Sequence, residues 1–216
     1  MKHQLCFGVL LSVILSLQLV NGQVPFPGNC PEVKVQADFQ LADYMGVWYE
    51  YEKYPFVFEV GRKCMYAIYN KTSDDSISVM NAAINKFTGK PSNTTGSAKV
   101  IASGQLSVSF PNSRTANSTK VNYEVLGTDY ETFAVVYSCS NVLRVAHTKL
   151  LWVLTRDQNP SEAVIEKAKA VIDANNLNKT FLLKTKQTDC DDKEDEPDTT
   201  EDGVNDATTV APEPAM

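Results

Sequence analysis

The stretch TKLLWVLTR at residues 148–156 is an apolar run of strand length that ends just before the turn-forming residues DQNP. Successive side chains of a strand point to opposite faces, so Leu150, Trp152 and Leu154 share one face. Arg156 follows on the same face, at the end of the run. The stretch therefore predicts a β-strand whose Trp152 face points into the interior of the protein.

Seven similar stretches precede it, and turn-forming residues separate each from the next. They occupy residues 47–54, 63–69, 77–85, 96–102, 105–110, 120–126 and 132–139. Further along, residues 161–176 (SEAVIEKAKAVIDANN) have helical periodicity, and a short strand is expected at residues 181–184. The apolar face of this helix is expected to comprise Ala163, Val164, Ala168, Val171 and Ile172.

Strands do not alternate with helices along the chain, which argues against a doubly wound α/β sheet. Eight antiparallel strands can close into a barrel, and closure removes the exposed sheet edges and leaves room for one small ligand. The predicted fold is therefore all-β: an eight-stranded antiparallel up-and-down barrel with one C-terminal α-helix packed outside.

Composition sets the two ends of the chain apart. Residues 1–22 combine Lys2, an apolar run from Leu5 to Val20 and small residues before Gln23, so they are expected to be a signal peptide. Residues 191–216 hold ten acidic residues and no aromatic one, and are expected to be a disordered acidic tail. Residues 23–190 then form a single domain, and the protein is expected to be secreted and extracellular, without a transmembrane segment.

The charge of the chain is concentrated in that tail. The whole sequence has 20 Lys and Arg residues against 26 Asp and Glu residues, a net charge of −6. Without the two terminal segments the balance is slightly positive. The predicted domain therefore lacks the strong basic bias that nucleic-acid binding needs.

Four cysteines, Cys30, Cys64, Cys139 and Cys190, remain once Cys6 leaves with the signal peptide. An even number in a secreted chain predicts two disulfides, for which the residues alone permit three pairings. None of the spacings is the close one of a zinc or redox site. Secretion also makes four Asn-x-Ser/Thr sequons candidate glycosylation sites on surface turns. These are Asn70, Asn93, Asn117 and Asn178.

The strand faces expected to point inward are aromatic and aliphatic, with a few polar groups. Such a composition fits a hydrophobic ligand pocket with orienting contacts, and it fits a filled core equally well. Glu50 and Glu52 share a face with Trp48, and a pair of acids there would fit a hydrolase. The favoured interpretation is that one or both of them lie beside Lys or Arg partners at the rim of the barrel.

Three short motifs occur in the order and at the spacing found in the lipocalin family. The sequence resembles that family in a Gly-x-Trp motif that opens the first barrel strand, a second motif before the seventh strand, and an arginine at the end of the eighth. These are Gly46 and Trp48, then Thr128, Asp129 and Tyr130, then Arg156. In lipocalins the arginine packs across the indole at the closed end of the barrel, where it gains cation–π energy.

The resemblance extends over residues 28–190 and implies the lipocalin calyx. Within the family the likeness is to apolipoprotein D and the insect Lazarillo proteins, carried by GNCPEVKV, YMGVWYEYEKYPFVFEVGRKC, VLGTDYETFAVVYSC and LLWVLTR. It implies the disulfide pairing Cys30–Cys139 and Cys64–Cys190.

The resemblance also implies a ligand and a site for it. The ligand class is a small lipophile, such as a fatty acid, steroid, retinoid or bilin, held in the barrel cavity. Ala83 and Asn85 stand where apolipoprotein D has a glutamate and an arginine, so a charged anchor for a carboxylate head is missing. The residues matching the family's ligand site are Phe58, Tyr69, Asn81, Tyr123, Phe133, Val135 and Trp152.

The sequence therefore predicts a secreted carrier of a small hydrophobic ligand, with roles in lipid handling and stress protection, rather than an enzyme. No cofactor or metal site is expected, because His147 is the lone histidine left after the leader. Expected partners are the lipophilic ligand and a lipid particle or cell-surface receptor, and no nucleic acid. The alternative is an extracellular signalling or adhesion glycoprotein that uses the barrel as a scaffold.

Overall fold

The computed structural model describes residues 25–111, 119–142 and 145–190, without the side chain of Phe58. The predicted signal peptide, the acidic tail and the sequon at Asn117 lie outside the described residues.

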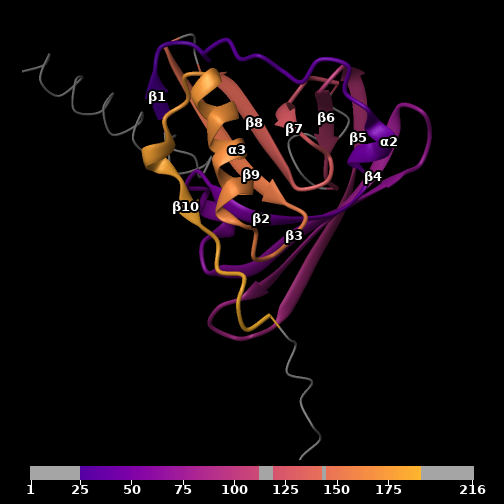
Figure 1. The fold of residues 1–216 in the computed structure, drawn as a ribbon, viewed down its shortest axis with the longest axis vertical. Helices are drawn as coiled ribbons and strands as arrows, with labels where there is room; N and C mark the ends of the chain where they lie inside the picture. Colours follow the sequence, from indigo (N-terminus) through magenta and orange to yellow (C-terminus); the bar gives the residue numbers. More distant parts are fainter. Residues whose placement is uncertain (1–24, 112–118, 143–144, 191–216) are drawn as a thin grey trace, which may run out of the picture.

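Eight strands form a closed antiparallel barrel, as predicted (Figure 1). Each strand pairs with the next along the chain, and β9 pairs back with β2 to close the ring. Consecutive connections therefore alternate between the two ends of the barrel. The strands are β2 (Gly46–Lys53), β3 (Arg62–Lys71), β4 (Ser76–Asn85), β5 (Pro91–Ala102), β6 (Gln105–Ser109), β7 (Tyr123–Thr128), β8 (Phe133–Val142) and β9 (Ala146–Thr155).

Short elements extend this ring at its edges. Strand β1 (Pro25–Pro27) pairs with β9, and β10 (Leu183–Lys184) pairs with β2. The helix α2 (Leu41–Tyr44) leads into β2, the 3-10 turn η1 (Val57–Glu59) lies between β2 and β3, and a second turn, η2 (Lys179–Phe181), precedes β10. Strand β1 was not predicted, because three residues with a proline at each end show no periodicity.

The helix α3 (Glu162–Ala174) packs on the outside of the barrel against β7 and β8 (Figure 1). Its buried residues are Ile165, Ala168 and Ile172. The predicted apolar face was therefore partly wrong, since Ala163 is exposed and Ile165 was missed. Gly127 on β7 permits the close approach, because a Cβ atom there would lie 2.8 Å from the Val171 side chain.

The buried apolar residues form two clusters, one on each side of the barrel wall. The inner cluster includes Trp48, Tyr69 and Val79 and fills the closed end of the barrel. The outer cluster lies between the wall and α3 and includes Val135 and Ile172. Strands β8 and β9 contribute to both clusters, so they are covered on both faces.

Two disulfides staple the segments that flank the barrel to its wall. Cys30 is bonded to Cys139 on β8, and Cys64 on β3 is bonded to Cys190. This pairing is the one that the lipocalin resemblance implies. Among the residues described, no helix is long and apolar enough to cross a membrane.

The three sequons in the described part of the chain are exposed at the asparagine. Asn70 and Asn93 lie within β3 and β5 rather than on turns, so that part of the expectation was wrong. Asn178 precedes η2, and its side chain accepts a hydrogen bond from the Thr180 backbone N–H. Glycosylation at these positions stays a prediction.

Candidate ligand-binding cavity

One end of the barrel is closed by an arginine stacked on a tryptophan. The Arg156 guanidinium carbon lies 3.8 Å from the centroid of the Trp48 ring. Its N–H groups donate to three backbone carbonyls, those of Val47 at 2.7 Å, Tyr130 at 3.0 Å and Asp43 at 3.2 Å. One side chain therefore ties β9 to the start of β2 and to the turn between β7 and β8.

Gly46 is required beside this stack. Its φ is +93°, which disfavours any side chain, and a Cβ atom there would lie 3.3 Å from Arg156 Nη1. The glycine of the first motif therefore leaves room for the arginine of the third.

The second motif fixes the turn between β7 and β8. The Asp129 carboxylate accepts hydrogen bonds from the backbone N–H groups of Thr132 at 2.8 Å and Phe133 at 3.0 Å. The Thr128 hydroxyl donates to the Phe133 carbonyl and accepts from the Tyr130 N–H. All three motifs are thus structural parts of the closed end.

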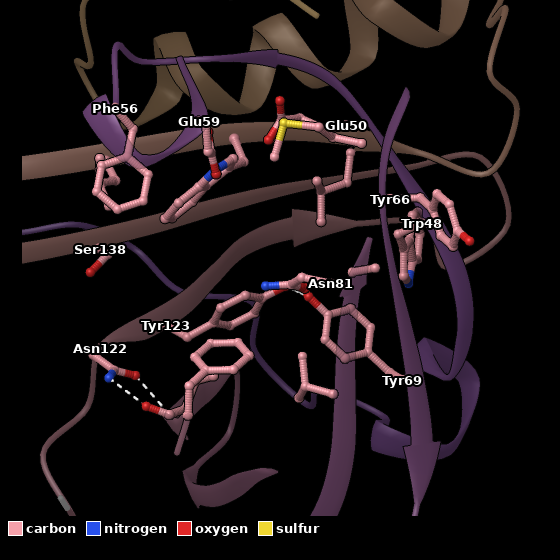
Figure 2. A pocket seen from close by; sticks show the side chains of 18 of the residues that line it. Trp48, Glu50, Phe56, Glu59, Tyr66, Tyr69, Asn81, Asn122, Tyr123 and Ser138 are labelled. Carbon is pink, nitrogen blue, oxygen red and sulfur yellow. Dashed lines mark hydrogen bonds between the residues drawn. The ribbon is translucent and has the colours of Figure 1, made fainter. Parts of the chain in front are cut away.

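Above this closed end the barrel encloses a cavity of about 370 Å³. Its lining is mostly aromatic and aliphatic, as is usual for small-molecule sites. The sequence was compatible with either a filled core or a pocket, and the structure contains a pocket (Figure 2). The lining residues are Trp48, Glu50, Phe56, Glu59, Met65, Tyr66, Ala67, Tyr69, Val79, Asn81, Ala82, Val108, Phe110, Asn122, Tyr123, Ser138, Ser140, Leu150, Trp152 and Leu154.

Four of the predicted ligand-site residues, Tyr69, Asn81, Tyr123 and Trp152, line this cavity. The side chain of Phe58 lies outside the described residues.

Phe133 and Val135 lie on the opposite face of β8, so their predicted position in the pocket was wrong. Val136, not Val135, is the partner of Trp152 in the β8–β9 ladder, so Val136 shares the inward face. Val135 and Phe133 therefore point outward and are buried in the outer cluster that α3 covers.

Three tyrosines form a polar group near the closed end. The hydroxyl of Tyr123 lies 2.8 Å from that of Tyr44 and 3.0 Å from that of Tyr69, within hydrogen-bond distance of both. Burial raises the pKa of Tyr69 to about 12 and the pKa values of Tyr44 and Tyr123 well above the usual range. The three hydroxyls are therefore protonated at neutral pH and can orient a polar group of a ligand.

An acidic cluster lies on the other side of the cavity, where β2 leads into η1 (Figure 2). It comprises Glu50, Lys53 and Glu59. Lys53 Nζ lies 2.8 Å from Glu50 Oε1 and 2.6 Å from Glu59 Oε2, and all three side chains are at most 14% exposed. Thr185 also donates its hydroxyl to Glu50 Oε1. The cluster thus holds two carboxyl groups and a single ammonium group.

Glu59 has a perturbed titration in this cluster. Burial, and then the nearby Glu50 carboxylate, raise the pKa of Glu59 to about 7, while Lys53 and a hydrogen bond with Trp152 favour its ionised form. Glu59 can therefore accept or release a proton near neutral pH.

A basic partner, as favoured for one or both of the two strand acids, is found for Glu50. Glu50 pairs with a lysine, as favoured over a hydrolase pair. Glu52 does not line the cavity, because the β2–β9 register shifts between Glu50 and Glu52. Within the described part of the chain, no three His, Cys, Asp or Glu residues are grouped to hold a metal ion.

Sequence reasoning missed Lys53, Phe56, Glu59, Met65 and Asn122 as parts of the site. Phe56 and Glu59 lie in the connection that contains η1, where strand periodicity gives no information. By contrast, Leu150 and Leu154 share the face of Trp152, and this alternation does place them in the cavity.

A closed eight-stranded barrel with an internal cavity, an Arg–Trp stack at one end and one external helix defines the lipocalin class of protein. The family model for a lipocalin-like domain matches residues 39–187.

Individual relatives agree with the family model. The chain is 32% identical over 194 residues to apolipoprotein D of Cavia porcellus, covering 85% of this chain and 96% of that protein. It is 34% identical over 185 residues to the Lazarillo protein of Schistocerca americana, covering 83% and 81%. The chain belongs to the lipocalin family of ligand-binding carrier proteins.

Solved structures support the fold independently. Insecticyanin from Manduca sexta superposes with a TM-score of 0.66 at 24% identity, over 76% of this chain and 89% of that one. At this identity the likeness supports the barrel fold alone.

Proposed function

We propose that the protein is a secreted carrier that holds a small hydrophobic molecule in the barrel cavity. The observation that carries the proposal is the apolar cavity of about 370 Å³ above an intact closed end. Removing apolar surface from water stabilises a bound ligand by about 25 cal/mol per Å². Asn81 and the tyrosine hydroxyls of the polar group would orient it. Candidate ligands are fatty acids, steroids, retinoids and bilins.

The proposal extends to secretion and to exchange partners. Two disulfides fit an oxidising compartment, which supports an extracellular location. Val57, Val60 and Phe87 are exposed apolar residues beside the η1 connection, where Phe56 and Glu59 line the cavity. A lipid particle or a cell-surface receptor could receive the ligand there, in the service of lipid handling and stress protection.

Fluorescence titration of the delipidated, secreted protein tests the proposal. The chain has two tryptophans, and both Trp48 and Trp152 line the cavity. Saturable quenching by one ligand class at micromolar or lower concentration is expected, and Trp152→Ala should weaken that binding in a folded protein. A folded protein that none of the four classes quenches would contradict the carrier function and favour a scaffold in signalling or adhesion.

A further inference from the structure

The two ends of the cavity differ in charge, and this difference bears on which lipophile fits. The cavity lining contains two carboxyl side chains, Glu50 and Glu59, and no Lys, Arg or His within the described residues. Lys53, which neutralises part of that charge, is itself held between the two carboxylates. When both acids are ionised, the acidic cluster therefore carries one net negative charge.

Two described cations lie beside the cavity lining, Lys53 and Arg156, and both are already engaged. Lys53 contacts both carboxylates and also lies 3.3 Å from Met65 Sδ. At the closed end, Arg156 already donates to three backbone carbonyls. Within the part of the chain that the structure describes, a ligand carboxylate buried at either end of the cavity would meet hydroxyl groups or carboxylates but no available ammonium or guanidinium group. A buried charge without a partner is costly.

We propose that the acidic cluster makes the cavity selective for lipophiles whose polar end is an uncharged hydroxyl, and that Glu59 is the residue that discriminates against the corresponding carboxylates. A hydroxyl can donate a hydrogen bond to the Glu59 carboxylate beside Trp152. A carboxylate can enter the same place only against repulsion, or after Glu59 has taken up a proton. This inference rests on the proposed carrier function and adds the chemistry of the ligand's polar end.

Proton uptake sets the size of the effect. At pH 8, about one unit above the pKa of Glu59, only about a tenth of the Glu59 side chains are protonated. A carboxylate ligand that binds only to this protonated form therefore has an affinity about tenfold lower. Repulsion without proton uptake would cost more, because two unit charges about 4 Å apart interact strongly at a partly buried site. Proton uptake is therefore the less costly route, and the carboxylate should bind about tenfold more weakly than the alcohol with the same apolar body.

Two matched ligand pairs test the inference: retinol against retinoic acid, and parinarol against parinaric acid. Each is titrated at pH 8 into the full mature protein, into Glu59→Gln and into Glu52→Gln. The last variant removes a carboxylate of β2 that does not line the cavity. Glu59→Gln should raise the affinity for both acids about tenfold and leave the alcohols nearly unchanged, whereas Glu52→Gln should keep the wild-type ratio.

Two outcomes overturn the inference while leaving the carrier function intact. One is equal affinity of the wild-type protein for alcohol and acid in both pairs, which requires no variant. The other is an unchanged ratio in a Glu59→Gln protein with wild-type circular dichroism. Failure of all four ligands to bind the folded wild-type protein would instead contradict the carrier function, and the inference with it.

Discussion

Glu59 is a buried acid whose ionised form is only partly compensated by its surroundings. Its pKa in the folded protein is about 7, against 4.5 for an ordinary glutamate. The folded state therefore binds more protons than the unfolded state between these two values. Stability from this residue is present below about pH 4.5 and is lost as the pH rises through 7.

The first prediction concerns this pH dependence. Replacing Glu59 with Gln should remove the loss of folding stability that accompanies the rise in pH. For the wild-type protein this loss amounts to no more than about 3 kcal/mol. Urea unfolding at intervals from pH 5 to pH 8 measures it. The variant's stability relative to wild type should rise with pH across this range, and Glu52→Gln should show no such trend. A pH-independent difference between wild type and Glu59→Gln would contradict the assigned environment of Glu59.

Arg156 acts through the geometry of its planar head. A lysine could retain the charge, but it cannot donate to carbonyls of three separate segments and stack on Trp48 at once. We expect Arg156→Lys to lower the free energy of unfolding by about 1–3 kcal/mol. Near-ultraviolet circular dichroism should also change, since Trp48 loses the cation over its ring.

Arg62→Lys is the matched control for this prediction. Arg62 on β3 donates a single exposed hydrogen bond, to Ser92 Oγ at 2.9 Å. Its substitution should change the free energy of unfolding by less than about 0.5 kcal/mol. Equal losses for the two arginines would mean that the stack on Trp48 adds nothing to stability.

At the scale of elements, α3 stabilises the barrel without contributing to the cavity. Ile172 is fully buried in the outer cluster, whereas the residues that line the cavity lie on the other side of the wall. Ile172→Ala should therefore lower the free energy of unfolding by about 2–5 kcal/mol through the cavity it leaves. Below the unfolding transition, the affinity for the bound lipophile should stay within twofold of wild type.

Glu166→Ala on the exposed side of α3 is the control. Glu166 makes only a 3.8 Å ion pair with Lys169, so its loss should cost less than about 0.5 kcal/mol. A large loss of ligand affinity in folded Ile172→Ala would show that α3 positions the cavity wall as well as covering it.

Strand β8 is buried on both faces, and this explains why its inward face could not be predicted from the sequence. The eight strands were predictable because their residues alternate and turn-forming residues separate them. Which face points inward was not predictable for β8, because both of its faces are apolar: one borders the cavity and the other borders α3. Phe133 and Val135 were therefore assigned to the wrong side, while Tyr69, Asn81 and Trp152 were placed correctly.

The acidic cluster could not be predicted from the sequence, for a different reason. Glu50 and Lys53 come together across a register shift in β2, and Glu59 joins them from a connection with no strand periodicity. Alternation holds only within an uninterrupted ladder. The disulfide pairing and the Arg156–Trp48 stack were implied by resemblance to the lipocalin family and not by the residues alone.

At the scale of the whole molecule, the two disulfides anchor different parts of the chain. Cys30–Cys139 holds the N-terminal segment on the outer face of β8. Cys64–Cys190 holds the segment after β10, whose Thr185 and Gln187 side chains bond to Glu50 on β2. Only the second disulfide therefore supports the wall that carries the acidic cluster.

The disulfides span 109 and 126 residues, and this similarity makes them a matched pair. Their loop-closure entropies differ by only about 0.1 kcal/mol. Removing either one, by changing both of its cysteines to alanine, should cost a similar amount of stability, about 2–5 kcal/mol. Urea unfolding of the two double variants measures this.

Ligand binding should separate the two variants, although their stabilities are alike. Without Cys64–Cys190, the segment after β10 is free to leave Glu50, so the affinity for retinol should fall several-fold at temperatures where the protein is folded. Without Cys30–Cys139, the affinity should stay within twofold of wild type, because that staple contacts only the outer face of the wall. An equal effect of both on affinity would mean that overall rigidity of the barrel, and not the segment behind the acidic cluster, shapes the cavity.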